Sequence, residues 1–295
     1  MADNILEVQD LTKYYGKIKG VENVSFQLKK GEIFGFIGPN GAGKSTTIRS
    51  IMNLINKTSG KILVEGREFG KNDVDIKMEI GYLPSEIYLY DDFTVKQMLD
   101  YHEKFYKKDL HKRRVELVKK LELDETKNIE DLSLGNLKKL GIILALMHEP
   151  KILILDEPTS GLDPIMQNIF YSILKEEKQK GTTIFYSTHI LSEVSKICDR
   201  VGIIKDGKLI KIEEMKELSK KNLIVVEITS SQINEVVEDV VKEFNVEIEN
   251  INENTIKFTG TISHDNLIKN LAKYKIDRIL IEEPSLEDMF LHYYK

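Results

Sequence analysis

Hydrophobic and polar positions along the chain follow two alternating periods. Short apolar runs bounded by turn residues predict strands at residues 5–11, 21–28, 32–38, 61–66 and 80–83, with a helix over residues 46–55. From Thr94 to about Met147 the pattern is helical, with long charged faces. Strand-like runs at residues 151–156, 182–188 and 200–205 then alternate with helix-like stretches. This alternation predicts an α/β fold built on a parallel sheet with crossover helices.

The pattern changes around residues 220–222. Residues 223–229 predict a strand, 233–244 a helix, 246–251 and 255–260 a strand pair, 264–274 a helix and 277–283 a strand, followed by a short tail at 284–294. This β-α-β-β-α-β order favours a small ferredoxin-like α+β domain. We therefore expect a main domain at residues 1–220, with a helical subdomain at about 84–147, and an accessory domain at residues 221–295.

The charge balance is acidic, which argues against a general nucleic-acid binder. The 295 residues carry a formal charge of -5 and have a pI near 5.8, whereas nucleic-acid-binding domains usually show a basic excess. No nucleic-acid partner is expected. Local basic clusters, namely Lys107 with Lys108 and residues 112–114, are interpreted as solvated helix faces.

Compartment and membrane topology follow from what the sequence lacks. Cys198 is the only cysteine, so no disulfide can form within the chain, and no Cys/His metal spacing is present. No apolar stretch approaches the roughly 18 residues that span a bilayer. The N-terminal residues include acids where a signal peptide carries lysines. We expect a cytoplasmic protein that reaches a membrane only through a partner.

A phosphate-binding loop follows the strand at residues 32–38. The sequence GPNGAGKST matches the G-x-x-x-x-G-K-[ST] pattern, and its candidate nucleotide-binding residues are Gly38, Pro39, Asn40, Gly41, Ala42, Gly43, Lys44, Ser45 and Thr46. Glycines let backbone N–H groups turn toward phosphate oxygens, and the following helix directs its positive end there. Lys44 can reach the β- and γ-phosphates of ATP, and Ser45 can ligate Mg²⁺.

Two adjacent acids end a later apolar run. KILILD is typical of a buried parallel strand that delivers Asp156 to its C-terminal end, where Mg²⁺ held by Ser45 needs a second anchor. Glu157 can polarise an attacking water as a general base. A strand followed by a capped turn would also explain Asp156, but not the whole sequence through Asp163.

With both motifs placed, residues 4–220 resemble the nucleotide-binding subunits of ABC transporters. In that family an LSGGQ signature corresponds to Leu132–Asn136 here, a D-loop to Ser160–Asp163, and a switch histidine to His189. The adenine-stacking aromatic corresponds to Tyr15, with Tyr14 as second choice. The resemblance implies a P-loop cassette with a mixed-sheet core, a β subdomain and a helical signature subdomain. It also implies a head-to-tail dimer in which Ser133, Gly135 and Asp163 of one subunit approach the ATP bound by the other.

Two positions depart from the family pattern. The signature carries Leu134 where glycine is usual, and leucine tolerates a positive φ poorly; it also carries Asn136 where glutamine is usual. The Q-loop glutamine, which touches Mg²⁺ in the family, corresponds to Ser85, whose side chain is too short for the same reach. Glu86 could substitute, a water could bridge, or the position could serve coupling alone.

The closing sequence EPSLEDMFLHYY resembles the end of ATPase subunits that pair with ABC-2-type membrane proteins, mostly bacterial exporters. An amphipathic helix packed on the main domain is the other interpretation of this tail. We therefore expect an ATPase peripheral to the inner face of the cell membrane, acting as a homodimer or with a related ATPase and driving export through a separate permease. A soluble ABC-type ATPase acting on ribosomes or DNA is the alternative, and a P-loop GTPase or small-molecule kinase would leave the signature unexplained.

Overall fold

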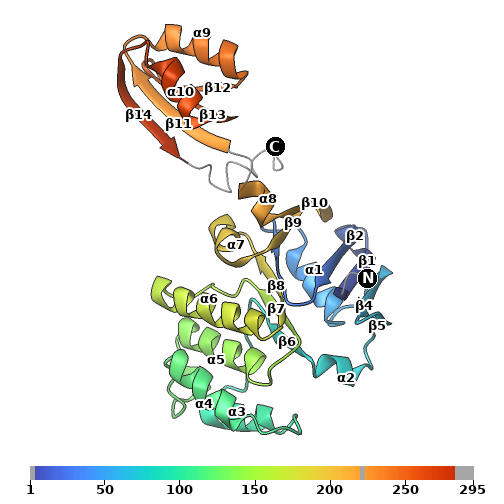
Figure 1. Ribbon diagram of the computed structural model, residues 1–295. Helices are drawn as coiled ribbons and strands as arrows, with labels where there is room; N and C mark the ends of the chain where they lie inside the picture. Colours follow the sequence, from blue (N-terminus) through green and yellow to red (C-terminus); the bar gives the residue numbers. More distant parts are fainter. Residues whose placement is uncertain (1–3, 220–222, 283–295) are drawn as a thin grey trace. The chain divides into compact units, whose positions relative to one another are not determined.

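The computed structural model describes residues 4–219 and 223–282, and Figure 1 shows their helices and strands. The chain divides into two compact units, Met1–Glu213 and Glu214–Lys295. This division lies slightly N-terminal to the boundary expected from the sequence. The tail at residues 284–294, on which the ABC-2-type resemblance rests, lies outside the described residues.

An antiparallel sheet forms one part of the first unit. Its strands run in the order β2-β1-β4-β5, with bounds β1 (Asn4–Tyr15), β2 (Ile18–Lys29), β4 (Ser59–Val64) and β5 (Arg67–Glu68). The first two strands are longer than the apolar runs that predict them, because their pairing continues through polar residues up to the turn at Gly16, where φ is +62°.

A six-stranded sheet forms the centre of this unit. Its order is β10-β9-β3-β8-β7-β6, with bounds β3 (Ile33–Ile37), β6 (Ile80–Leu83), β7 (Ile152–Asp156), β8 (Thr183–Thr188), β9 (Arg200–Lys205) and β10 (Lys208–Glu214). The neighbouring strands from β9 through β3, β8 and β7 to β6 pair in parallel, which confirms the predicted parallel core. Every residue of β3, β7 and β8 is buried, as expected for strands covered on both faces.

In the part of the first unit that the structure describes, the helices that connect or cover these strands are α1 (Lys44–Ile51), α2 (Val74–Lys77), α3 (Val95–Glu103), α4 (His111–Lys120), α5 (Leu134–Leu146), α6 (Pro164–Gln179) and α7 (Leu191–Ile197). The predicted helix at 46–55 is wrong at both ends. It begins at Lys44, where the phosphate loop closes, and ends at Ile51. Asn53 adopts a left-handed φ of 55°, and the N–H groups of Leu54 and Ile55 both donate to the carbonyl of Arg49.

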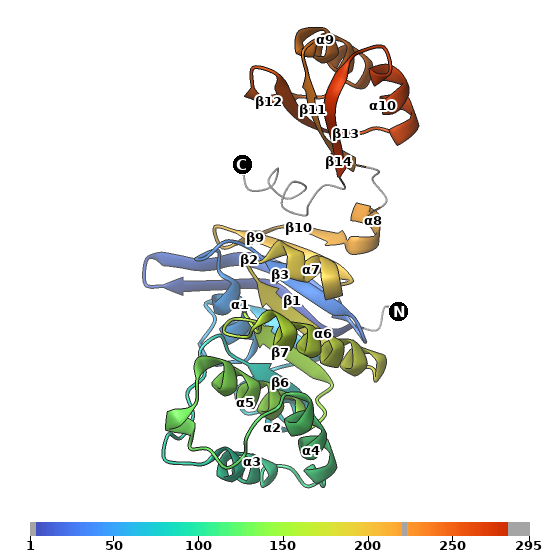
Figure 2. The same cartoon turned by 90° about the vertical axis from the view of Figure 1, so that its left-hand side faces the viewer.

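Helices α3, α4 and α5 lie side by side next to the β6 edge of the central sheet (Figures 1 and 2). They correspond to the predicted helical subdomain, and α3 starts with a capping box between Thr94 and Gln97. The interpretation of residues 112–114 as a solvated face is wrong for Arg113 and Arg114. Both are buried: Arg113 pairs with Glu177 of α6 at 2.5 Å, and Arg114 pairs with acids of its own subdomain.

The second unit contains a four-stranded antiparallel sheet, the helices α9 and α10 that share its core, and the short helix α8. Its elements are α8 (Met215–Ser219), β11 (Leu223–Ser230), α9 (Ile233–Phe244), β12 (Ile248–Asn252), β13 (Thr255–Thr261), α10 (His264–Leu271) and β14 (Ile276–Glu282), with sheet order β12-β13-β11-β14. Val236 of α9 and Leu267 of α10 share one buried core with Val226 and Phe258 of the sheet. The predicted element order is therefore observed. Among the residues that the structure describes, no helix in either unit has the length and apolar character to cross a bilayer.

The buried pair between Arg113 and Glu177 should be a main support of the helical subdomain. Glu177→Ala removes the buried carboxylate and leaves the Arg113 guanidinium only its pair with the partly exposed Glu116 at 2.8 Å, so we expect a loss of about 3 kcal/mol in the free energy of unfolding. The neighbouring Glu176 pairs with Lys120 at 2.6 Å in a partly exposed position, and Glu176→Ala should cost about 1 kcal/mol or less. Urea unfolding followed by circular dichroism measures both, and equal losses would contradict this account.

Candidate active site

The phosphate loop connects β3 to α1 and contains the predicted residues Gly38 to Thr46. Gly41 and Gly43 have φ values of +80° and +107°, which side chains rarely tolerate. A Cβ added to Gly43 would also lie 2.6 Å from Val21. Because the backbone closes tightly at these glycines, the N–H groups at the start of α1 face the space enclosed by the loop, as an anion site requires.

Lys44 places its ammonium group at the centre of this loop. The side chain is buried, and its Nζ donates to the carbonyl oxygens of Gly38 at 2.8 Å and Pro39 at 3.2 Å. The same Nζ forms an ion pair with Glu157 Oε1 at 3.3 Å. The lysine thereby joins the phosphate loop to the acidic end of β7, as the sequence predicts for two halves of one site.

Asp156 ends β7 as a buried carboxylate without a hydrogen-bond partner. It is 1% exposed, and neither carboxylate oxygen has a partner within the described part of the chain. Burial raises the pKa of Asp156; the nearby hydroxyls of Ser45 and Ser187 partly offset this rise, although neither meets the geometry of a hydrogen bond to it. A buried, unpartnered carboxylate is costly unless another group binds it, so Asp156 has unused acceptor capacity beside Ser45.

Glu157 lies between two basic groups. Its Oε1 faces Lys44, while its Oε2 lies 2.9 Å from Nδ1 of His189. The residue has a left-handed φ of 47°, and its N–H donates to the carbonyl of Ser187 at 3.0 Å. Backbone strain of this kind persists only where surrounding contacts fix it. The structure thus brings together Lys44, Glu157 and His189 from three separate motifs.

A buried network behind His189 was not anticipated from the sequence. Glu193 of α7 is buried and accepts hydrogen bonds from Thr159 at 2.5 Å, Tyr186 at 3.0 Å and Thr188 at 2.7 Å. Thr188 directly precedes the histidine, and Thr159 lies in the loop after Glu157. The carboxylate therefore ties the two segments that carry Glu157 and His189. An acid in a mainly polar helix gives no sequence signal of such burial.

The predicted signature residues lie at the start of α5. Ser133 is the N-cap and its hydroxyl accepts from the N–H of Asn136 at 3.3 Å. Leu134 opens a right-handed helix, so the anticipated conflict between leucine and a positive φ does not arise. A Cβ added to Gly135 would lie 3.0 Å from the carbonyl of Gly161, and one added to Gly161 would lie 2.9 Å from Leu134. The signature thus packs against the D-loop of its own chain.

Asp163 caps the next helix. Its Oδ1 accepts from the N–H groups of Ile165 at 3.0 Å and Met166 at 2.9 Å, at the start of α6. Its predicted approach to a nucleotide on a second subunit stays a prediction.

Comparison with known proteins places this geometry in a family. A family model described as "ABC transporter" matches residues 21–160. The linearmycin resistance ATP-binding protein LnrL of Bacillus subtilis is 35% identical, and the alignment covers 98% of this chain and 97% of that protein. The chain belongs to the ATP-binding subunits of ABC transporters. This ABC subunit is also 37% identical to the bacitracin transport ATP-binding protein BcrA of Bacillus licheniformis, over 97% of this chain and 96% of the relative.

Solved structures agree with the cassette fold. An ATP-binding subunit of an ABC transporter superposes with a TM-score of 0.69 at 30% identity, covering 74% of this chain and 92% of that chain. The dimeric structure of a bacterial ABC transporter cassette gives a TM-score of 0.65 at 25% identity, covering 71% of this chain and 98% of that one. The ABC subunit is therefore an ATPase that binds ATP and belongs to a transporter complex.

Tyr15 of the ABC subunit ends β1 close to the phosphate loop. A Cβ added to Gly20 would lie 3.0 Å from both the Tyr15 ring and the Thr46 methyl group, so these two side chains flank the same glycine. The Tyr15 ring is half exposed, with the Lys13 ammonium 4.8 Å from its centre. The hydroxyl of Tyr14, in contrast, is bonded to Glu22 at 2.7 Å. Tyr15 thus keeps a ring face accessible near the site, which favours it over Tyr14.

Lys138 of α5 is a second site residue that the sequence analysis missed. Its side chain is buried, and its Nζ donates to the carbonyl oxygens of Ser85 at 3.0 Å and Glu157 at 3.4 Å. Burial lowers the pKa of Lys138, and the carboxylates of Asp156 and Glu157 oppose this effect. A lysine on the apolar face of the run LKKLGIILAL was the available signal.

Removal of the Lys44 ammonium should destroy the phosphate site. We expect Lys44→Ala to weaken ATP binding by at least about tenfold, because charge-assisted hydrogen bonds to phosphate are lost. Hydrolysis should fall with it. The exposed Lys71 provides a matched control, and Lys71→Ala should bind ATP normally. Titration with a fluorescent ATP analogue measures both affinities, and an unchanged affinity of Lys44→Ala would refute the assignment.

Proposed function

We propose that this ATPase is the energy-coupling subunit of an exporter, peripheral to the inner face of the cell membrane, and that it acts as an ATP-dependent dimer on a separate ABC-2-type permease. The contact set that joins Lys44, Glu157 and His189 carries this proposal, since it connects the phosphate loop with the group suited to activate water. The relatives named for linearmycin resistance and bacitracin transport support antibiotic export.

The residues at the end of β7 fit a Mg²⁺ ion. Mg²⁺ prefers oxygen ligands and is commonly held by one or two protein groups together with substrate phosphates. Ser45 offers a hydroxyl at the start of α1, and the two Asp156 oxygens are buried without hydrogen-bond partners in the described residues. When bound there, the ion would neutralise phosphate charge during hydrolysis.

Glu157 is the general base in this proposal. Its two carboxylate oxygens contact different basic groups, the Lys44 ammonium on one side and the imidazole of His189 on the other, so the carboxylate has a fixed direction. When the Lys44 ammonium turns to the ATP phosphates, Oε1 becomes available to accept a proton from the attacking water. His189, about half exposed, is then placed to contact the γ-phosphate.

The signature serves a second copy of the chain. The helix α5 begins with Ser133 and Gly135 at its positive end, which is suited to bind an anion. Among the described residues, this helix end contacts its own first turn and Gly161. The chain's own phosphate loop is contacted instead by Lys44. We therefore assign Ser133, Gly135 and Asp163 to the ATP of a partner subunit, and Tyr15 to the adenine of the chain's own ATP.

The second unit is proposed to be a ferredoxin-like accessory domain. Its strand order β12-β13-β11-β14 places the first and third strands of the β-α-β-β-α-β series at the centre of an antiparallel sheet. Helices α9 and α10 contribute to one core with that sheet. No catalytic role is assigned to this unit.

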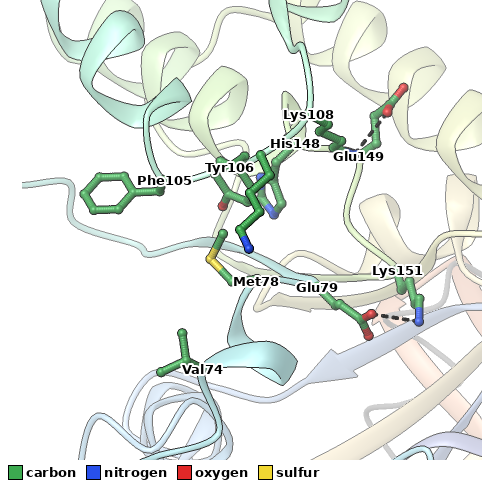
Figure 3. A pocket seen from close by; sticks show the side chains of 10 residues that line it. Val74, Met78, Glu79, Phe105, Tyr106, Lys108, His148, Glu149 and Lys151 are labelled. Atoms are coloured by element: carbon green, nitrogen blue, oxygen red, sulfur yellow. Dashed lines mark hydrogen bonds and ion pairs between the residues drawn. The ribbon is translucent and has the colours of Figure 1, made fainter.

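A groove in the first unit is the proposed docking site for the permease. It has a volume of about 590 Å³ and lies among α2, the segment after α3 and the segment between α5 and β7 (Figure 3). Val74, Met78, Phe105 and Tyr106 supply its apolar surface. Two ion pairs also line it, Lys108 with Glu149 at 3.2 Å and Lys151 with Glu79 at 2.9 Å. Apolar grooves with charged residues beside them typically accept amphipathic helices, and the permease's cytoplasmic loops would supply one.

Aromatic residues extend this surface toward Ser85. Phe105 contacts Tyr101 at 5.1 Å between ring centres, and Tyr101 contacts Tyr90 at 6.0 Å. Tyr88, Tyr90 and Phe105 are 84%, 54% and 55% exposed, a concentration of accessible aromatic surface that favours a protein partner. The groove and the segment after β6 therefore form one continuous contact surface.

Substitution of the proposed base tests the ATP-driven dimer. Glu157→Gln should bind ATP, lose at least about a hundredfold in hydrolysis rate, and accumulate as a dimer with ATP and Mg²⁺ in sizing experiments. Adding Ser133→Arg to this variant should prevent the dimer while leaving ATP binding by the single chain intact. A monomeric Glu157→Gln protein would refute ATP-driven closure, and loss of ATP binding by the double variant would refute the role of Ser133 across the dimer.

Disruption of the groove tests permease docking. Phe105→Asp should reduce co-purification with the membrane protein encoded next to this chain by about tenfold or more, because it places a charge in the apolar surface. ATP binding by the isolated chain should not change. Val115 is a comparably exposed apolar residue on α4 and does not line the groove, so Val115→Asp is the control. Equal effects of the two substitutions would argue against this docking site.

A further inference from the structure

The ammonium group of Lys138 joins three segments that belong to different motifs. The lysine lies on α5, five residues after the signature serine, and is 2% exposed. Its Nζ donates to the main-chain carbonyl of Ser85, which follows β6, and to that of Glu157, which follows β7. Neither contact involves the side chain of the partner. The two hydrogen bonds therefore depend on where the main chains of Ser85 and Glu157 lie, and not on which side chains these residues carry.

A buried ammonium requires compensation. Burying an unpaired charge is costly, and in this chain the carboxylates of Asp156 and Glu157 favour the charged form of Lys138. A methionine or leucine at this position of an apolar helix would avoid that cost. The arrangement is therefore poorly explained by packing alone and well explained by a need for a donor at this point.

The main chain of Glu157 is stabilised by such a donor. Its backbone has a left-handed φ of 47°, which a non-glycine residue rarely adopts. Its N–H donates to the carbonyl of Ser187, and its carbonyl accepts from the Lys138 ammonium at 3.4 Å and from the N–H of Ser160 at 3.4 Å. Loss of the Lys138 contact would leave the carbonyl held only by the turn at Ser160, so that the carboxylate would be less firmly directed toward Lys44 and His189.

We propose that Lys138 is a positioning residue for ATP hydrolysis, which holds the main chain of Glu157 in its active direction and links that direction to the placement of α5 and Ser85. The Ser85 side chain is short. The hydrogen bond from Lys138 to the Ser85 carbonyl therefore links this segment to the site, as a longer side chain at position 85 could have done. A movement of α5, or of the segment that begins at Ser85, then changes the hydrogen bond between Lys138 and the Glu157 carbonyl.

This inference rests on the proposed role of Glu157 as the base. The test uses the full-length chain with three substitutions. Lys138→Met removes the donor while keeping the length of the side chain, and Lys138→Gln restores an uncharged donor. Lys139→Met removes a charge from the adjacent, less buried position of the same helix and serves as the control.

The expected result is a fall in kcat with little change in ATP affinity. Lys138→Met should lower kcat by about tenfold to a hundredfold, the effect of one lost charge-assisted hydrogen bond, with the Kd for ATP within about twofold of the unmodified chain. Lys138→Gln should recover part of that loss, and Lys139→Met should behave as the unmodified chain. Nucleotide titration also shows that each variant is folded.

Two results would overturn the proposal. One is a kcat of Lys138→Met within about twofold of the unmodified chain; the other is a loss of ATP affinity in proportion to the loss of kcat, which a structural role would produce. Glu157→Gln measured in parallel separates the two levels of inference. If Glu157→Gln hydrolyses ATP normally, the role of Glu157 fails; if only Glu157→Gln is impaired, the role of Lys138 fails alone.

Discussion

Two adjacent carboxylates close to two buried lysines are the interaction on which the rest of the site depends. Asp156 ends a strand that is buried along its whole length and Glu157 directly follows that strand, so water has little access to the charge of Asp156. Lys44 approaches from the phosphate loop and Lys138 from the signature helix. Removal of any one of these four charges leaves the others uncompensated in a low-dielectric environment. The loop, the sheet and the helical subdomain are therefore fixed relative to one another by electrostatics as well as by packing.

Much of this arrangement could be predicted because it is encoded locally. One continuous segment contains strand β3, Gly41, Gly43 and the start of α1. Within this segment the local backbone conformation explains the residue types. The placement of Asp156 at the end of a parallel strand likewise follows from an uninterrupted apolar run. The order of elements in the second unit was predictable because strand and helix periods there alternate without interruption.

The features that the sequence did not reveal depend on contacts distant along the chain. Arg113 lies in a run of basic residues that is typical of a solvated face, and only the partner on α6, 64 positions later, explains its burial. Lys138 and Glu193 each have their polar partners on other elements, so local periodicity could not assign them. The concern about Leu134 was wrong for the opposite reason: a family pattern suggested a special backbone conformation, whereas an ordinary helix start suffices.

The contact between Leu134 and Gly161 has a consequence for communication between ATP sites. Because a side chain at Gly161 would collide with Leu134, the start of α5, which we assign to a partner's nucleotide, and the loop that follows Glu157 fit together only as a matched pair. In a dimer of the proposed kind, a displacement of the signature by one ATP is passed to the loop beside the other. The two sites would then hydrolyse ATP cooperatively, with a Hill coefficient above one. The fit of Leu134 against Gly161 would set how strongly hydrolysis at one site depends on the other.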